Sequence, residues 1–160
     1  MTAATRQKGT FWLVLVCVAG TLAGCASSGD PGGDSDGVVV LTPAEARELI
    51  EREDDLFVLS VCHKWEFDYY RIPGSAMVPH HLLASWLGGA ELYPEINQGR
   101  RPGKDQPVLL YCSTGGRTRK ASKQMARMGY RRVYVLGGGM RDWMRAGIPY
   151  DKTTLVEEDR

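Results

Sequence analysis

The sequence lacks several features that would assign a class of function at once. It has no excess of positive charge, with 20 Lys and Arg against 19 Asp and Glu, which argues against a dedicated nucleic-acid binder. It holds neither a Cys-x-x-Cys nor a His-x-x-x-His pair, so we expect no metal and no cofactor. It shows no internal repeat, and its 160 residues suit a single folded domain.

The sequence also lacks an apolar run that would span a bilayer as a helix. The apolar stretch 11–24 is shorter than the roughly 20 residues that such a helix needs. Arg6 and Lys8 precede this stretch, and small residues end it. This order is typical of a secretory signal peptide, and a short uncleaved membrane anchor is the alternative.

The end of that stretch, Leu22-Ala23-Gly24-Cys25, resembles the signal of bacterial lipoproteins. The resemblance implies that residues 1–24 are a signal peptide, cut off before Cys25, and that Cys25 is then acylated. The protein would be held in the cell envelope by this lipid anchor, facing the periplasm. Ala26 follows the cysteine where an Asp could stand, which resembles lipoproteins sent to the outer membrane.

The segment after Cys25 is rich in Gly, Ser and Asp and has no large apolar side chain up to Gly37. It cannot bury enough surface to offset its ordering entropy. We therefore expect residues 25–37 to be a lipidated cysteine and a flexible tether. The folded domain is expected at 38–151, with a C-terminal tail at 152–160.

Strand-like and helix-like segments alternate within 38–151. Short apolar runs predict strands at 38–41, 56–61, 76–78, 107–111 and 133–136. Helices are expected after the capping residue Thr42, at 65–70, at 81–87, from the glycines 115–116 to about 128, and around Trp143. Residues 88–106 are loop-like. This alternation predicts an α/β fold, with a mainly parallel central sheet flanked by helices.

Cys112 is the candidate nucleophile. It ends the strand at 107–111 and precedes a helix, and sites in such folds form beyond the carboxyl ends of strands. There a thiolate is stabilised by the helix dipole and by unpaired backbone N–H groups. Gly115 and Gly116 let successive N–H groups turn toward one point. The alternative is that Cys112 is a small buried apolar side chain.

Cations crowd the first turn of the helix that follows. Arg117, Arg119 and Lys120 lie there, although the helix dipole disfavours positive charge at this end. Such a local conflict often marks a functional site. An anionic ligand would resolve it.

Cys112, Gly115, Arg117 and Thr118 match the Cys-x-x-Gly-x-Arg-Ser/Thr pattern of the rhodanese-like sulfurtransferases, which the chain resembles over 38–151. Flanking signatures also match: Glu66-Phe67, Ile72-Pro73-Gly74, Leu136 through Gly138, Trp143, and Ala146-Gly147-Ile148-Pro149. The resemblance implies a sulfurtransferase in which Cys112 takes a sulfur from a small anionic donor such as thiosulfate. The resulting persulfide passes it to a thiophilic acceptor.

The substrate-binding residues implied by this resemblance are those of the loop: Ser113, Thr114, Gly115, Gly116, Arg117 and Thr118. The hydroxyl groups of Ser113 and Thr114 are expected to meet donor oxygens, and Arg117 is expected to orient the anion. Two alternatives stay open. One is a non-catalytic rhodanese-like module that binds a protein partner or presents sulfur in an envelope complex. The other is a cysteine phosphatase or arsenate reductase, whose loop places the arginine six positions after the cysteine rather than five.

Two departures from the family pattern bear on the pocket. Ser60-Val61-Cys62 stands where the family usually has Asp-x-Arg, and Tyr70-Arg71 stands where it usually has Gly-His. If Cys62 lies at the same sheet edge as Cys112, it could resolve the persulfide or form a disulfide. The alternative is a buried structural thiol.

Overall fold

The structure is a computed structural model, and it describes residues 33–34 and 37–153. The signal peptide expected at 1–24, the lipidated Cys25 and most of the tether lie outside the described residues, as do residues 154–160 of the expected tail. No helix in 37–153 combines the length and the apolar character needed to cross a membrane.

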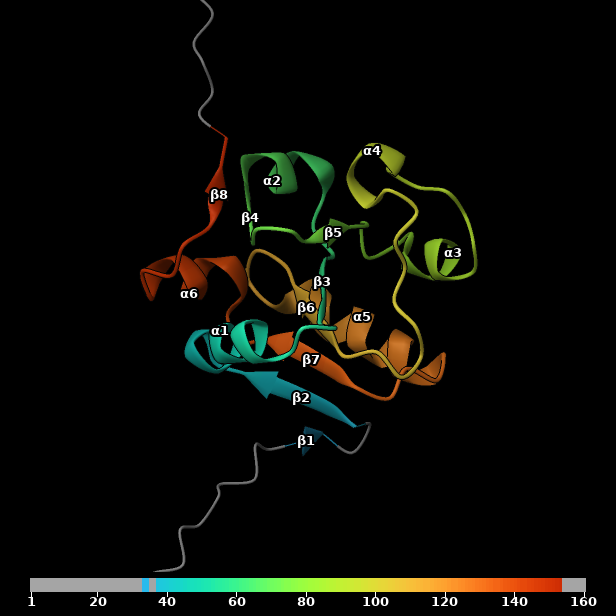
Figure 1. The fold of residues 1–160 in the computed structure, drawn as a ribbon, viewed down its shortest axis with the longest axis horizontal. Helices are drawn as coiled ribbons and strands as arrows, with labels where there is room; N and C mark the ends of the chain where they lie inside the picture. The colour runs from blue at the N-terminus through green and yellow to red at the C-terminus, as the bar shows by residue number, and fades with distance from the viewer. Residues whose placement is uncertain (1–32, 35–36, 154–160) are drawn as a thin grey trace, which may run out of the picture.

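Six strands form the central sheet. Their bounds are β1 Gly33–Asp34, β2 Val38–Leu41, β3 Phe57–Ser60, β5 Ala76–Met77, β6 Val108–Tyr111 and β7 Val133–Leu136. Their order across the sheet is β1-β2-β7-β6-β3-β5. All neighbours pair in parallel except β1, which pairs antiparallel with β2. The predicted α/β fold with a mainly parallel sheet is confirmed (Figure 1).

Helices cover both faces of this sheet (Figure 1). They are α1 Pro43–Arg52, α2 Lys64–Tyr69, α3 Leu83–Leu87, α4 Pro94–Asn97, α5 Gly116–Arg127 and α6 Gly139–Arg145. The start of α1 follows the sequence prediction: the Thr42 hydroxyl accepts the Glu45 N–H at 3.3 Å, and the Glu45 carboxylate accepts the Thr42 N–H at 2.8 Å. This reciprocal pair satisfies two N–H groups that the helix leaves open.

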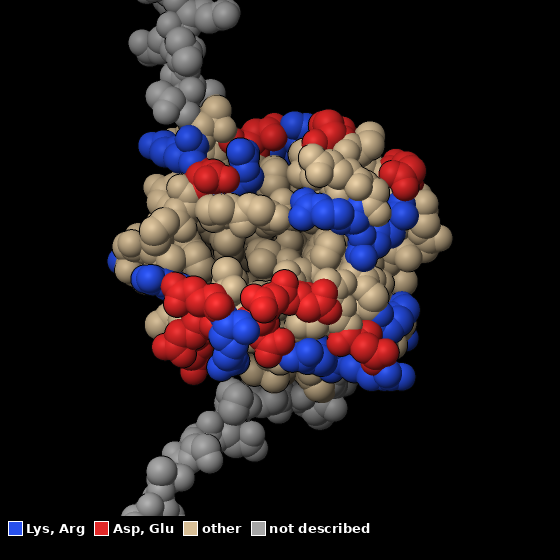
Figure 2. Space-filling view, in the orientation of Figure 1, with Lys and Arg blue, Asp and Glu red and all other residues tan. Residues whose placement is uncertain are grey.

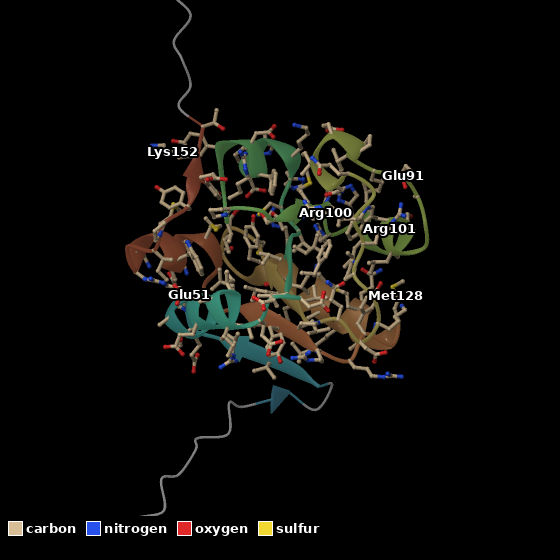
Figure 3. All side chains as sticks on the ribbon, in the orientation of Figure 1. Glu51, Glu91, Arg100, Arg101, Met128 and Lys152 are labelled. Carbon is tan, nitrogen blue, oxygen red and sulfur yellow. The ribbon has the colours of Figure 1, made fainter. Side chains whose placement is uncertain are left out.

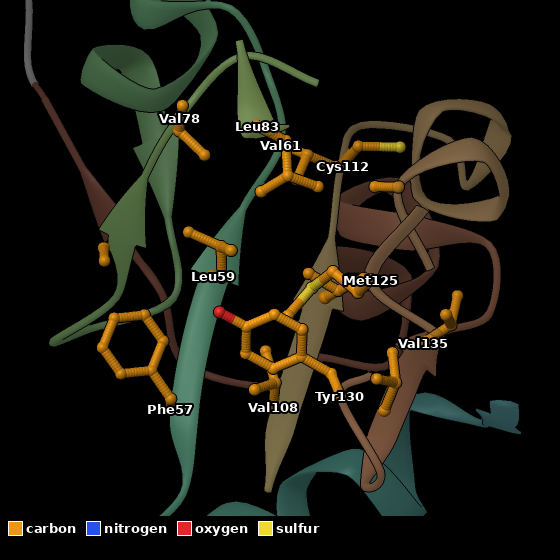
Figure 4. Packing of buried hydrophobic residues seen from close by; sticks show 14 of the residues in the cluster. Phe57, Leu59, Val61, Val78, Leu83, Val108, Cys112, Met125, Tyr130 and Val135 are labelled. Carbon is orange, nitrogen blue, oxygen red and sulfur yellow. The ribbon is translucent and has the colours of Figure 1, made fainter. Parts of the chain in front are cut away.

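The alternation of β6 divides the core into two layers. Leu109 and Tyr111 pack with α1 and α6, whereas Val108, Leu110 and Cys112 pack on the opposite face with α3 and α5. Successive side chains of a strand point to opposite faces, so the strand register decides which layer receives the cysteine. Figure 4 shows Cys112 at one end of the second layer, beside Val61.

The fold departs from the sequence prediction at four places. Strand β1 at Gly33–Asp34 forms inside the tether expected at 25–37. The segment 88–106 contains the short helix α4, and the helix expected from His81 begins only at Leu83. A second, two-stranded sheet joins β4 Tyr70–Arg71 to β8 Asp151–Lys152. Pairing between segments so distant in sequence leaves no local pattern that could predict it.

Candidate active site

The turn from β6 into α5 wraps around the Cys112 sulfur. The N–H of Gly115 donates to Sγ at 3.1 Å, and Gly115 has a φ of 91°, a conformation that glycine adopts without strain. Burial raises the pKa of the Cys112 thiol, but the N–H groups of Thr118, Thr114, Arg117 and Gly115 outweigh burial and lower it. These donors favour the charged form, so the loop stabilises a thiolate, as the sequence predicts.

Two carbonyl groups of the same loop accept hydrogen bonds from the start of α6. Cys112 O accepts the Met140 N–H at 2.8 Å and Ser113 O accepts the Arg141 N–H at 3.0 Å, both from the first turn of α6. Gly139 makes this approach feasible, because a Cβ there would lie 2.2 Å from Cys112 O. With its carbonyls fixed outward, the loop keeps its N–H groups turned toward the sulfur.

Arg117 forms an ion pair with Glu66 of α2. Its Nη2 donates to Oε1 at 2.6 Å, and its Nη1 donates to Oε2. The Glu66 carboxylate also accepts the His63 N–H at 2.9 Å and the Ser113 hydroxyl. Burial raises the pKa of Glu66, but Arg117, Ser113 and the His63 N–H together lower it to about 2. The guanidinium predicted to orient an anion is therefore neutralised by a carboxylate.

The Ser113 hydroxyl is occupied at the centre of this network. It donates to Glu66 and accepts from Arg117 Nη2 and from the Tyr70 hydroxyl, each at 3.0 Å. A hydroxyl has one donor and two acceptor positions, so no position is left for a donor oxygen in this conformation. Whether Ser113 contacts substrate stays a prediction.

The remaining loop residues lie around the same sulfur. The Thr118 hydroxyl donates to Gly115 O at 2.6 Å and lies 4.0 Å from Cys112 Sγ. Thr114 and Gly116 are exposed at the start of α5. Their substrate contacts also stay predictions.

Two residues of this network are not predicted as site residues by the sequence. Glu66 belongs to a flanking signature, and Tyr70 stands where the chain departs from the family pattern. The signal for Glu66 is its place in the first turn of a helix that follows a strand end, where a carboxylate is favoured. Nothing local shows that Tyr70 would reach Ser113, 43 positions away in the sequence.

Cys62 follows β3, the strand next to β6, and lies at the rim of the site. Its Sγ is 3.8 Å from the Ser113 hydroxyl. Burial raises the pKa of the Cys62 thiol and outweighs the opposite effect of the neighbouring Ser60 and Ser113 side chains. Cys62 and Cys112 are both free thiols in this structure, and a resolving role for Cys62 stays a prediction.

Access to Cys112 is closed in this conformation, since its relative exposure is 0%. A substrate reaches the sulfur only when some of the residues that cover Cys112 move.

Three histidines lie close together, with ring centroids 6.3 Å apart for His63 and His81 and 5.5 Å apart for His80 and His81. Within the described part of the chain, no three His, Cys, Asp or Glu side chains are arranged to hold a metal ion.

The sequence model of the rhodanese-like domain matches residues 42–146. The chain belongs to the rhodanese-like family. The loop from Cys112 to Thr118 lies within the matched residues. Membership implies a sulfur donor and a sulfur acceptor in general terms.

The relatives of this rhodanese-like chain include named sulfurtransferases. It is 24% identical over 111 residues to the thiosulfate sulfurtransferase GlpE of Glaesserella parasuis, covering 69% of this chain and 91% of that protein. It is 31% identical over 104 residues to a sulfurtransferase of Allochromatium vinosum, covering 65% and 85%. These relatives support a sulfurtransferase-like enzyme in general.

Solved structures agree on the fold. A rhodanese-related protein of Thermoplasma volcanium superposes with a TM-score of 0.55 at 22% identity, covering 70% of this chain and 96% of that one. At this identity the likeness supports the architecture alone.

Proposed function

We propose that the protein is a thiosulfate sulfurtransferase that carries sulfur on Cys112. The observation that carries the proposal is the convergence of four backbone N–H groups on a buried sulfur whose pKa they lower. A lowered pKa increases the fraction of thiolate at neutral pH, and the thiolate is the nucleophilic form of cysteine. The same N–H groups would stabilise negative charge on a persulfide.

The reaction has two balanced steps. The Cys112 thiolate attacks the outer sulfur of thiosulfate, the sulfur–sulfur bond of the donor breaks, and sulfite leaves with the bonding electron pair. An acceptor such as cyanide then attacks the outer sulfur of the persulfide, leaves as thiocyanate and restores the thiolate. Neither step needs an external oxidant or reductant.

The state of Arg117 argues against the phosphatase alternative. A tetrahedral phosphate needs a guanidinium available for two hydrogen bonds, whereas Arg117 is already bound in this way by Glu66. The loop is also one residue shorter than that of a cysteine phosphatase. The shorter loop, and not the pairing of Arg117, favours transfer of a single sulfur atom, because thiosulfate is a tetrahedral dianion as well.

The burial of Cys112 favours a second candidate, a non-catalytic rhodanese-like module. A sulfur with no exposed surface suits a domain that binds a partner and performs no chemistry. One experiment separates the two: thiosulfate:cyanide transfer by wild type and by Cys112→Ala, with mass spectrometry of the Cys112 peptide after incubation with thiosulfate.

We expect thiocyanate from wild type alone, and one added sulfur atom on Cys112. If correctly folded wild type yields neither product, the enzyme proposal is wrong and the module is favoured. If Cys112→Ala is as active as wild type, transfer does not use this loop. Arg117→Ala is expected to weaken use of the anionic donor, because it releases Glu66 and Ser113 at the rim.

We also propose that the protein is a lipoprotein of the cell envelope. The proposal rests on the motif Leu22-Ala23-Gly24-Cys25 and on the general need for more than one acyl chain to hold a protein stably at a membrane. In a bacterial host, wild type should fractionate with membranes and carry acyl chains on Cys25. Cys25→Ser should lose the acyl chains. An unacylated N-terminal peptide from wild type would overturn this proposal.

A further inference from the structure

A cavity of about 530 Å³ lies beside the loop, between α5 and the outer strands of the sheet. Val38 and Val40 of β2 and Val135 of β7 form its apolar lining. Gly115 and the turn at 137–138 also line it. The cavity lies where α5 stops covering the sheet: α5 packs mainly on β6 and β7, and β2 is the next strand outward (Figure 1).

The wall of this cavity that α5 provides is positively charged. Arg119 and Lys123 line it one helical turn apart, with Ser122 between them, and no Asp or Glu lines it within the part of the chain that the structure describes. Among the described residues, neither Arg119 nor Lys123 forms an ion pair. Like charges four residues apart repel, and Arg119 also stands at the helix end where the dipole disfavours a cation.

Two of the cations in the first turn of α5 therefore differ in their surroundings. Arg117 is neutralised by Glu66, whereas Arg119 faces the cavity together with Lys123. An anion between these two side chains would offset both their repulsion and the unfavourable dipole. The anion that the sequence leads us to expect thus has a place beside the catalytic loop.

We propose that this cavity binds a small organic anion with an apolar body. Its acidic group would lie between Arg119 and Lys123, and its hydrocarbon part would cover Val40, which is 50% exposed. The volume is within the range of small-ligand sites. The site shares Gly115 with the loop but not Cys112, so it does not depend on sulfur transfer.

A second cavity, of about 330 Å³, lacks this character. It lies at the start of β3 and is lined by Glu53, Asp54 and Arg100 among others. Figure 2 shows side chains of both charges on this face, and Figure 3 labels Arg100 there. Arg100 already donates to the carbonyls of Asn97 and Gly74, each at 3.3 Å. The mixed charge gives this cavity no preference for an anion.

The test uses the full-length protein, labelled with ¹⁵N, and isocaproate as the probe. We expect saturable shifts of the Gly115, Gly137 and Gly138 amide signals. The neutral isocaproamide, which has the same hydrocarbon part, should bind more weakly. Higher salt should weaken isocaproate binding, because the attraction is between accessible charges.

Variants separate this cavity from the catalytic loop. Arg119→Gln and Lys123→Gln should each weaken isocaproate binding by about threefold to tenfold. Lys120→Gln is the matched control, since Lys120 is exposed on the same helix and does not line the cavity. Cys112→Ser should bind as wild type does.

Four results would each overturn the proposal: no saturable shift, equal binding of acid and amide, no effect of either charge-removing variant, or loss of binding in Cys112→Ser. The last would mean that the anion occupies the catalytic loop. None of these results bears on whether Cys112 transfers sulfur, so the proposed function stands or falls separately.

Discussion

Cys62 and Cys112 follow neighbouring parallel strands and are both buried, yet their thiols differ. The pKa of Cys62 is raised and that of Cys112 is lowered. Burial raises both, because a low dielectric disfavours the thiolate. The N–H groups of the loop reverse the effect at Cys112, whereas at Cys62 the neighbouring Ser60 and Ser113 side chains lower the pKa by less than burial raises it. Backbone curvature, and not position at the sheet edge, gives the two buried thiols their opposite pKa shifts.

The largest expected effect comes from displacing the curved backbone. In Gly139→Ala the new Cβ would collide with Cys112 O and with the Ser113 carbonyl carbon, at 2.2 and 2.8 Å. Neither is the flexible end of a side chain, so the loop must shift. A displacement on the order of 1 Å costs about a hundredfold in rate. We expect a loss of that order in thiosulfate:cyanide transfer, together with a raised pKa of Cys112.

Gly147→Ala is the matched control for that collision. Gly147 has a φ of 69° against 63° for Gly139, but a Cβ at Gly147 would meet nothing within 4 Å. Both variants carry the strain of a left-handed alanine, about 1–2 kcal/mol. Only Gly139→Ala should reduce transfer. Equal activity in the two variants would show that contact between α6 and the loop does not maintain the site.

The second prediction compares the two thiols directly by their reactivity. Iodoacetamide should modify Cys112 with a pH midpoint below the ordinary value for cysteine, and Cys62 with a midpoint above it, because only the thiolate reacts. Digestion and mass spectrometry report each cysteine separately, so both are measured in one wild-type sample. If the two midpoints coincide, the N–H groups of the loop do not stabilise the Cys112 thiolate.

Glu66 provides a third, smaller test through the acid stability of the fold. The pKa of Glu66 is lowered to about 2 in the folded protein, so its ionised form stabilises the fold above the unfolded value, roughly 4.3. That stabilisation is lost as pH falls from about 4.3 to about 2. We expect Glu66→Gln to lower the free energy of unfolding at pH 7 by about 2 kcal/mol.

Chemical denaturation of wild type and Glu66→Gln at several pH values measures this effect. The difference between the two proteins should shrink below pH 4.3, because protonation removes the same charge from wild type. The Cys62 pKa should fall in the variant, since the Glu66 carboxylate is one of the charges that raise it. If the difference in free energy of unfolding between the two proteins stays constant with pH, the ion pair between Glu66 and Arg117 does not stabilise the fold.

Local sequence predicts the strands and the turn that form this site, but not the hydrogen bonds and ion pair between its side chains. The buried runs at 133–136 and 108–111 and the glycines after Cys112 contain enough local information to predict two strands and an N–H-lined turn. Arg117 shows the limit: its charge suggests an anionic substrate, but its partner is Glu66, 51 positions earlier. Tyr70 reaches Ser113 in the same way. Such partners depend on how strands are ordered in the sheet, which spacing along the chain does not record.

The smallest expected effect is that of Cys62→Ala, which asks whether the second thiol has chemistry of its own. The side chain is buried, so its removal should cost about 1 kcal/mol of stability. Transfer should stay within about twofold of wild type, because the raised pKa leaves Cys62 protonated near neutral pH. Assays of transfer and of persulfide on Cys112 measure both steps. If persulfide accumulates on Cys112 while transfer falls by about tenfold, Cys62 is a resolving thiol. The two cysteines would then act one after the other, with Cys112 first accepting the sulfur and Cys62 next releasing it.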